Sequence, residues 1–323
     1  MEDHTLVVGS IAFDHVFSIE PSFKQELPII KGELKKVNMT FVATSDTIII
    51  SGGTGSNISY SHALLSDRVY MFSAVGHDFK GTMGRSLADM GVKDRTVVFD
   101  RDTARSLQIT DKHGEQMIVW QPNAYEKIND IDLSMTLSSE EIKSCNRAIF
   151  SPGTPISTIR HMKNYRKHNP TGQILFDPGQ MINFYNNEQF MWCLDQANYL
   201  IVNEVELNKV EKAFNLTDEQ ILNKHQVDYI IVTFGSEGSK IIAKDKEIKI
   251  PVYSEGITVD TEIEATGAGD AYRGAMLGAL TLGYDLETAC KYGSVISGLC
   301  VRFNGGQLHN ISFDSAKEKV EKL

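Results

Sequence analysis

The feature that most constrains the fold is a regular alternation of helical and strand patterns from about residue 137 to the C-terminus. Within it, Tyr229–Phe234 (YIIVTF) is a short β-branched run, typical of a strand buried on both faces. Such alternation predicts an α/β fold with a mostly parallel central sheet, which binds ligands at the carboxyl ends of its strands. Helices are expected at Ser138–Ser144, Pro155–His168 and Glu188–Gln196, and strands at Arg147–Phe150, Ile174–Asp177 and Tyr199–Val202.

The first 135 residues show the same kinds of pattern, interrupted by two segments at about residues 14–50 and 96–123. The second segment contains two alternating stretches joined by a Lys-His-Gly turn, which predicts a β-hairpin. Because no linker or repeat divides the chain, we predict one domain, residues 1–323, with a small β-sheet lid. Strands are also expected at Thr5–Gly9 and Arg68–Val75, and helices at Asn57–Leu65 and Phe79–Met90.

Composition excludes several classes of function. The 323 residues include 32 Lys and Arg against 42 Asp and Glu, a net charge of −10 that disfavours nucleic acid as a partner. No apolar run approaches the ~18 residues of a membrane span. The four cysteines show no paired spacing, as in a protein of a reducing compartment. We therefore expect a soluble, cytoplasmic protein without nucleic-acid or membrane partners.

The strongest chemical signal is the segment Glu264–Asp270 (EATGAGD), which is followed by an apolar helical stretch. Glycines ahead of a helix let free backbone amides approach an anion, and the helix dipole favours negative charge there. Gly267, Ala268 and Gly269 would form an anion hole, and Asp270 could accept a proton from a hydroxyl beside it. On spacing alone, a glycine turn capped by Asp270 is an equal alternative.

This pattern resembles the signature of the ribokinase-like (PfkB) carbohydrate and nucleoside kinases. Four other segments match the family in the expected order, so the resemblance covers nearly the whole chain. It implies a ribokinase-like three-layer sandwich, ATP as phosphoryl donor, Mg²⁺ as cofactor and Asp270 as the catalytic base. The matching segments are Gly9–Asp14, Ser51–Asn57, Asn203–Glu206 and Thr233–Gly238.

The resemblance also implies roles for the matched residues. Asp14 would bind substrate hydroxyls, since a carboxylate can accept from two at once, with a solvated turn as the alternative. The acceptor site would also include Gly52, Gly53 and Asn57, although Asn57 is alternatively a helix cap. Nucleotide binding is implied for Asn203, Thr233, Gly235, Gly238 and Thr266.

Asn203 and Glu206 lie one helical turn apart, so their side chains share a face. The resemblance implies that Glu206 holds magnesium through water, whereas the spacing alone also fits a capping box. Glu264 stands where many relatives have an aspartate that helps bind a monovalent cation. The resemblance therefore gives no expectation of potassium activation.

Local features favour a nucleoside over a free sugar as the acceptor. Asp270–Arg273 (DAYR) resembles the D-A-F-R-A-G of prokaryotic nucleoside and adenosine kinases. Gly305–His309 resembles their G-x-Q-N-H, with Leu308 departing, and Thr54 replaces the lysine of the ribokinase glycine motif. We predict phosphorylation of a nucleoside 5′-hydroxyl, with adenosine first, in purine salvage. A kinase of ribose, fructose or a related sugar is the alternative, and intact Asp270 disfavours a sensor without turnover.

The predicted lid supplies candidates to cover a base. Gln108 could hydrogen-bond a purine edge, and four apolar residues could form a wall. The alternative is that these four pack the lid's own core or a contact of a homodimer formed through the lid. Arg273 and His309 fit structural roles better than chemical ones. The four wall candidates are Phe13, Phe41, Ile118 and Trp120.

Overall fold

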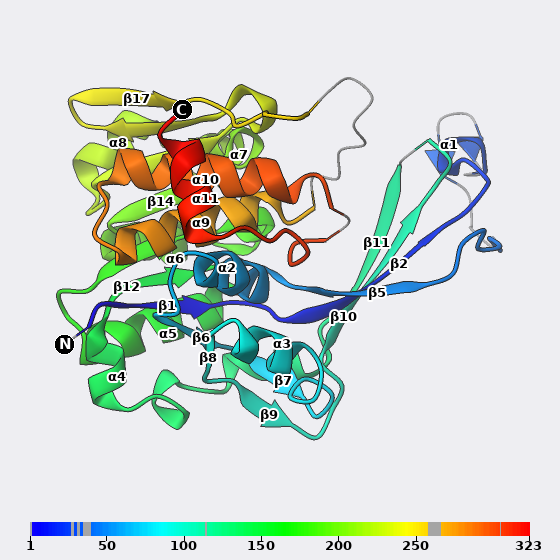
Figure 1. Cartoon of the computed structure of the whole chain (residues 1–323), viewed down its shortest axis with the longest axis horizontal. Helices are drawn as coiled ribbons and strands as arrows, with labels where there is room; N and C mark the ends of the chain where they lie inside the picture. Colours follow the sequence, from blue (N-terminus) through cyan, green and yellow to red (C-terminus); the bar gives the residue numbers. More distant parts are fainter. Residues whose placement is uncertain are drawn as a thin grey trace.

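A nine-stranded sheet runs through the body of the computed structural model, which describes residues 2–26, 29–30, 33–34, 40–113, 115–257, 266–303 and 305–323 (Figure 1). Seven neighbouring strands are parallel, and the last two return antiparallel as a hairpin at one edge. In sheet order the strands are β17 (Lys246–Ile250), β16 (Ser239–Ala243), β15 (Tyr229–Thr233), β14 (Tyr199–Asn203), β13 (Gln173–Phe176), β12 (Cys145–Phe150), β1 (His4–Val8), β6 (Val69–Phe72) and β8 (Lys93–Asp94).

Both faces of this sheet are buried. Successive residues of β15 alternate between the two cores, because Ile230 and Val232 enter one cluster and Ile231 enters the other. In β12, Ile149 and Phe150 divide in the same way. Burial on both faces explains why these strands read as continuous apolar runs in the sequence.

Helices cover each face and complete three layers, so the predicted α/β three-layer sandwich is confirmed. One face carries η1 (Asn123–Asn129), η2 (Leu133–Met135), α4 (Ser139–Ser144), α5 (Pro155–His168), η3 (Gly179–Phe184), α6 (Asn187–Gln196), α7 (Glu204–Phe214) and α8 (Asp218–Lys224). The other carries α2 (Thr54–Ala63), α3 (Met83–Asp89), α9 (Ala268–Thr281), α10 (Leu286–Cys300) and α11 (Phe313–Val320). In the part of the chain that is described, no helix is long and apolar enough to cross a membrane.

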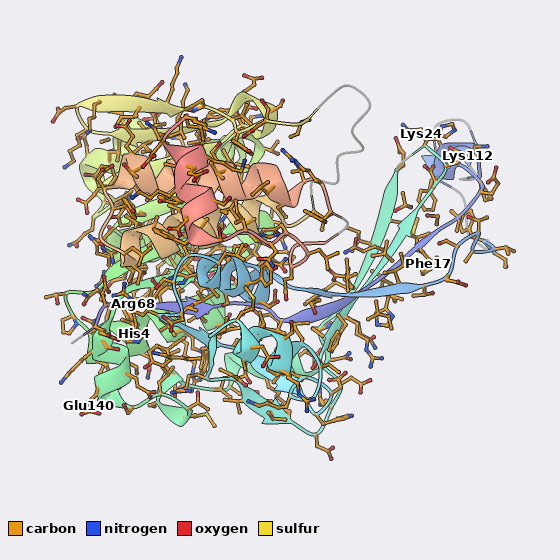
Figure 2. The ribbon with its side chains drawn as sticks, viewed as in Figure 1. His4, Phe17, Lys24, Arg68, Lys112 and Glu140 are labelled. Carbon is orange, nitrogen blue, oxygen red and sulfur yellow. The ribbon has the colours of Figure 1, made fainter. Side chains whose placement is uncertain are left out.

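A second sheet projects from the body as a lid (Figure 1). Its strands, in order, are β11 (Gln116–Gln121), β10 (Ala104–Thr110), β2 (Ala12–Ser18) and β5 (Ile48–Gly52). The hairpin of β10 and β11 was predicted, but the parallel pairing of β10 with β2 was not. Residues near the outer end of the lid include Phe17, Lys24 of α1 (Phe23–Glu26) and Lys112 (Figure 2). A separate pair, β7 (Ala74–Gly76) and β9 (Val97–Phe99), lies outside the lid sheet, and β3 (Ile29–Ile30) pairs with β4 (Glu33–Leu34).

Helices α2 and α9 approach each other closely at two glycines of α9. A Cβ added to Gly274 would lie 2.3 Å from the carbonyl oxygen of Ile58, and one on Gly278 would lie 3.0 Å from that of His62. No other residue type fits at Gly274 without moving the α2 backbone. This contact brings the start of α2 beside the start of α9, where the candidate site lies.

We expect Gly274→Val to lower the free energy of unfolding by at least about 1–3 kcal/mol, because the new side chain meets backbone that cannot rotate away. Urea denaturation monitored by circular dichroism measures the change. Gly81→Ala is the control, since a Cβ there meets nothing within 4 Å, and it should stay within about 0.5 kcal/mol of the parent. Equal stability of the two variants would contradict the close helix contact.

Candidate active site

Two pockets flank the N-terminus of α9. The first, which we call the lid pocket, has a volume of about 640 Å³ and lies between the lid sheet and the body; Asp14, Gln108, Trp120 and Asp270 are among its lining residues. The second, the hairpin pocket, has a volume of about 420 Å³ and lies between the turn that joins β15 to β16 and the helices α9 and α10. Both lie at the carboxyl side of the parallel strands, as expected for this class of sheet.

The predicted anion hole stands at the boundary between the pockets. Gly267, in the left-handed conformation with φ 80°, caps α9 and lines the lid pocket, whereas Ala268 and Gly269 line the hairpin pocket. The first amides of a helix have no partner within it and carry the positive end of the dipole. A phosphate group that lies between the two pockets would therefore be within reach of these amides.

Asp270 occupies the first turn of α9 and faces the lid pocket. Its Oδ2 accepts a hydrogen bond of 3.0 Å from Nδ2 of Asn57, and Oδ1 of Asn57 accepts one of 3.0 Å from Nε2 of Gln307. Burial raises the pKa of Asp270 to about 6, against the opposing effect of the Asn57 hydrogen bond. A carboxyl group with a pKa near neutrality is suited to taking up a proton during a reaction.

Asn57 has two hydrogen-bond partners within the protein. The resemblance implied substrate binding for this residue, and the structure shows that its side chain also contacts Asp270 and Gln307. Asn57 also lines the lid pocket, so it reaches both the candidate base and the space where a substrate would lie.

Asp14 lies on β2 in the same pocket, with only 8% of its surface exposed. Burial, followed by the charge of Asp270, raises the pKa of Asp14 to about 7, while Ser106 opposes the shift. A Cβ on Gly52 would lie 2.1 Å from Oδ2 of Asp14, so this glycine makes room for the carboxylate. Gly53, with φ 92°, turns the chain into α2 and lines the pocket.

The inner face of the lid sheet forms one wall of the lid pocket. Ser106 and Gln108 of β10 lie opposite Trp120 and Ile118 of β11, so all four share a face and line the pocket. Nε2 of the buried Gln108 donates a hydrogen bond of 3.3 Å to Oγ of Ser106.

Two of the four predicted wall residues lie elsewhere. Phe13 packs against the core of the body, and Phe41 makes an edge contact with the ring of Phe23 at a centroid distance of 5.6 Å. The alternative of packing within the lid fits Phe41 alone, since Phe13 packs against the body, whereas Ile118 and Trp120 line the pocket.

The opposite wall was missed in the sequence. It is built by turns that follow the carboxyl ends of β12 and β13, and by η1. The signal that could have found it is the pair of proline-glycine turns, SPGT and DPGQ, each directly after a strand. These residues are Tyr125, Glu126, Ile128, Asn129, Pro152, Gly153, Thr154, Gln180 and Met181.

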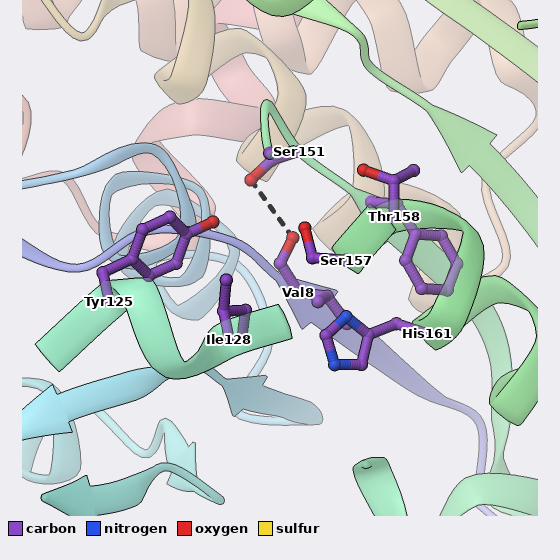
Figure 3. A pocket seen from close by; sticks show the side chains of 9 residues that line it. Val8, Tyr125, Ile128, Ser151, Ser157, Thr158 and His161 are labelled. Atoms are coloured by element: carbon purple, nitrogen blue, oxygen red, sulfur yellow. Dashed lines mark hydrogen bonds between the residues drawn. The ribbon is translucent and has the colours of Figure 1, made fainter. Parts of the chain in front are cut away.

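A small cavity of about 10 Å³ lies behind this wall and shares Tyr125, Ile128 and Gly153 with it. Figure 3 shows Tyr125 and Ile128 on η1 facing Ser157 of α5, with Oγ of Ser151 donating a 3.1 Å hydrogen bond to the carbonyl oxygen of Val8. The cavity is at the lower limit for one water molecule. The lid pocket thus ends at a well-packed wall.

The residues predicted to bind nucleotide divide between locations. Thr233, Gly235 and Gly238 line the hairpin pocket, but Thr266 lines the lid pocket. Asn203 and Glu206 line neither pocket; they form a capping box at the start of α7, with bonds of 2.8 and 2.9 Å. Glu264, which bears on potassium activation, lies outside the described residues.

The described residues include no group of three or more His, Cys, Asp or Glu side chains that could hold a metal ion. Mg²⁺ keeps several waters and commonly binds one or two carboxylates together with substrate phosphates. Glu206 offers one such carboxylate, and because it lines neither pocket it would reach a magnesium ion beside the phosphates only through water.

Residues 39–311 match the family model described as pfkB family carbohydrate kinase. The chain belongs to the PfkB family. The sequence-based assignment is thereby confirmed, and the two pockets and the start of α9 can be considered as parts of a PfkB kinase.

Relatives of this PfkB chain include kinases of nucleosides and of sugars. It is 26% identical to the nucleoside kinase of Methanocaldococcus jannaschii over 98% of this chain and 96% of that protein. It is 27% identical to the ribokinase of Lactococcus lactis over 86% of this chain and 88% of that protein.

Among solved structures, that of the Methanocaldococcus jannaschii nucleoside kinase, described as an archaeal member of the ribokinase family, has a TM-score of 0.83 with 26% identity, over 100% of this chain and 99% of that one. The Burkholderia thailandensis nucleoside kinase in complex with inosine has a TM-score of 0.80 with 24% identity, covering 98% and 97%. The predicted ribokinase-like fold is therefore confirmed.

We expect kcat to fall as the pH drops through about 6, because protonated Asp270 cannot accept a proton from the acceptor hydroxyl. Asn57→Ala should move this acid limb to higher pH, since the hydrogen bond it removes favours the carboxylate. Steady-state rates between pH 5 and 8 at saturating substrates measure both effects.

Asp14 also titrates in this range, with a pKa of about 7, so Asp14→Asn is the matched control. That variant should keep an acid limb in kcat near pH 6, because Asp14, the group with the higher pKa, is mostly uncharged where Asp270 titrates. A kcat that is independent of pH in the parent, or an unmoved limb in Asn57→Ala, would exclude Asp270 as the base.

Proposed function

We propose that this chain is an ATP-dependent nucleoside kinase that phosphorylates the 5′-hydroxyl of a nucleoside. The observation that carries the proposal is the composition of the lid pocket. The pocket holds the carboxyl groups of buried Asp14 and half-buried Asp270, and the lid covers it with the apolar Ile118 and Trp120. The carboxyl groups suit a sugar with vicinal hydroxyls, and the apolar side chains suit the flat face of a base.

The size of the lid pocket supports the same acceptor. Its volume of about 640 Å³ lies within the range of about 300–1,000 Å³ typical of small-molecule sites, which leaves room for a base beside a ribose. Burying a base against Ile118 and Trp120 would contribute roughly 25 cal/mol per Å² of apolar surface removed from water. A free sugar has no comparable surface to bury.

The charges of the lid pocket indicate an acceptor without phosphate. Its described lining residues include Asp14, Glu126 and Asp270 but no Lys, Arg or His. Thr54 takes the place of the ribokinase lysine, and its hydroxyl lies 3.2 Å from Oγ of Ser10 and 2.9 Å from Oγ of Ser151. A phosphorylated substrate would place its charge among carboxylates with no cation to pair it. The proposed acceptor is therefore a neutral nucleoside.

The proposed mechanism assigns a task to each group. Asp14 accepts hydrogen bonds from the ribose hydroxyls, while Asp270 takes the proton of the 5′-hydroxyl as the phosphoryl group transfers in line. The amides of Gly267, Ala268 and Gly269 stabilise the charge on that group. Magnesium, held through water by Glu206, would neutralise the phosphates of ATP. Lid closure would exclude water as a competing acceptor.

The hairpin pocket is the proposed site of the adenine of ATP. Val252, Tyr253 and Val301 give it apolar walls, and its floor includes Ala268 and Gly269 at the start of α9. A nucleotide seated there would direct its phosphates toward the anion hole. This geometry supports ATP as the phosphoryl donor, because the nucleotide and acceptor pockets meet at one helix end.

Two classes of relative bear on the acceptor. The whole-length similarity to the Methanocaldococcus jannaschii nucleoside kinase supports a nucleoside, and the similarity to the Lactococcus lactis ribokinase keeps a sugar kinase as the alternative. Within nucleosides we propose adenosine or a close purine, and hence purine salvage, because of the DAYR segment at the start of α9. All four cysteines are buried thiols, which supports a reducing, cytoplasmic compartment.

We expect kcat/KM for adenosine or another purine nucleoside to be at least about tenfold above that for ribose or fructose, because binding energy from the base also aids alignment of the hydroxyl. Initial rates of ADP release across adenosine, inosine, cytidine, ribose, fructose and fructose 6-phosphate measure this.

Asp270→Asn should lose about 10²-fold or more in kcat with nearly unchanged nucleoside affinity, because only proton removal from the acceptor hydroxyl is lost.

A free sugar that outran every nucleoside would reject the nucleoside proposal in favour of a sugar kinase. Faster turnover of fructose 6-phosphate than of fructose would contradict the argument from charge. Tight nucleoside binding without ADP release would instead indicate a sensor.

The outer face of the lid supports a homodimer formed through the lid. Ile49, Leu107, Met117 and Val119 share that face and are 37–60% exposed. A twofold axis would pair this apolar patch with its own copy. We expect the parent to sediment as a dimer and Val119→Lys to shift it to the monomer. Analytical ultracentrifugation checks this, and a monomeric parent at micromolar concentration would reject the dimer.

A further inference from the structure

A fully buried arginine stands directly behind the anion hole. Arg273 lies one turn into α9 from Asp270 and is 6% exposed. Its Nε lies 2.7 Å from Oδ2 of Asp177, and one of its amino nitrogens donates a hydrogen bond of 3.0 Å to Oδ1 of that residue. The two groups thus form a buried ion pair joined by one hydrogen bond, because Nε–H of Arg273 is close to the carboxylate but not aligned to donate to it.

The other amino nitrogen of Arg273 reaches the phosphate-binding turn itself. It donates a hydrogen bond of 3.1 Å to the carbonyl oxygen of Gly269. A Cβ on Gly269 would lie 2.9 Å from this nitrogen, so the glycine and the arginine pack directly against each other. The arginine therefore links the turn at the start of α9 to Asp177, which follows the carboxyl end of β13.

Arg273 is also the cation among a group of carboxylates. Burial alone would lower the pKa of its guanidinium, but Asp177, Asp270 and Glu206 outweigh burial and raise it. An arginine remains charged under these conditions, whereas a lysine can lose its proton when buried. The fixed positive charge lies on the side of Asp270 away from the lid pocket.

We propose that Arg273 is a positioning residue for phosphoryl transfer: anchored by Asp177, its guanidinium fixes the first turn of α9 so that the amides and Asp270 hold their places around the transferring group. The inference rests on the proposed function, because it assigns the anion at this turn to the γ-phosphate of ATP. Arg273 touches neither pocket among the described residues, so it acts through Gly269 and Asp270.

The test uses the full chain and the variants Arg273→Met, Arg273→Lys, Asp177→Asn and the double variant Asp177→Asn/Arg273→Met. Loss of the guanidinium and its bonds to Asp177 and Gly269 should lower kcat about 10²-fold in Arg273→Met, because small misplacement of reacting groups is costly, while KM for the acceptor changes little. Arg273→Lys should recover part of kcat by keeping the charge. The double variant should be less impaired than the product of the single effects, since it leaves no buried charge unpaired.

Arg147→Met is the matched control. Arg147 is a part-buried arginine 2.6 Å from Asp3, in the half of β12 that lies away from the site. It should lose stability in thermal melts while its kcat stays within about twofold of the parent. A kcat of Arg273→Met within threefold of the parent, or a loss that only follows melting temperature in both arginine variants, would overturn the positioning role.

A second measurement is independent of turnover. Calorimetric titration should show that Arg273→Met weakens ATP binding at least about threefold more than ADP binding, because the turn acts on the γ-phosphate. Equal weakening of both nucleotides would overturn the proposal. If the parent phosphorylates neither nucleosides nor sugars, the proposed function fails, and the ratio of ATP to ADP affinity still decides the role of Arg273.

Discussion

The contact of α2 with α9 at Gly274 is the constraint on which the site depends. Because the two backbones almost touch there, the first turns of both helices open onto the same pocket. Asn57 can then reach Asp270, although 213 residues separate them in the chain. A side chain at the crossing would push the helices apart, and the hydrogen bond that orients the carboxyl group of Asp270 would be lost. The close packing of α2 against α9 thus determines the position of Asp270 in the lid pocket.

Burial explains the electrostatics of the lid pocket. Burial raises the pKa of Asp14 to about 7 and that of Asp270 to about 6. Behind them Arg273 supplies a permanent positive charge, whereas the lining residues of the lid pocket that the structure describes include no cation. This asymmetry suits a reaction in which the acceptor is neutral and the donor is an anion that approaches from the other side of the helix end.

Local chemistry could be predicted from the sequence, and long-range pairing could not. The order T-G-A-G-D before an apolar helix is sufficient to place Asp270 beside free amides, because a helix terminus is defined by neighbouring residues. The continuous apolar run of β15 likewise predicted a doubly buried strand. By contrast, the parallel pairing of β2 with β10 and the hydrogen bond from Gln307 to Asn57 depend on segments far apart in sequence. The same limit hid the turns after β12 and β13, whose residues meet the lid only in three dimensions.

In the lid sheet, the residue proposed to recognise the ribose and the residues proposed to recognise the base lie on different strands. Asp14 lies on the inner strand β2, held between β5 and β10 and joined to β1 by only three residues, whereas Ile118 and Trp120 lie on the edge strand β11. An edge strand has one neighbour, so its side chains can change without disturbing a second ladder. In the proposed function, the surface that meets the base can therefore diverge while the carboxylate that meets the ribose stays fixed. A lineage with this lid could acquire a new base preference through substitutions on a single strand.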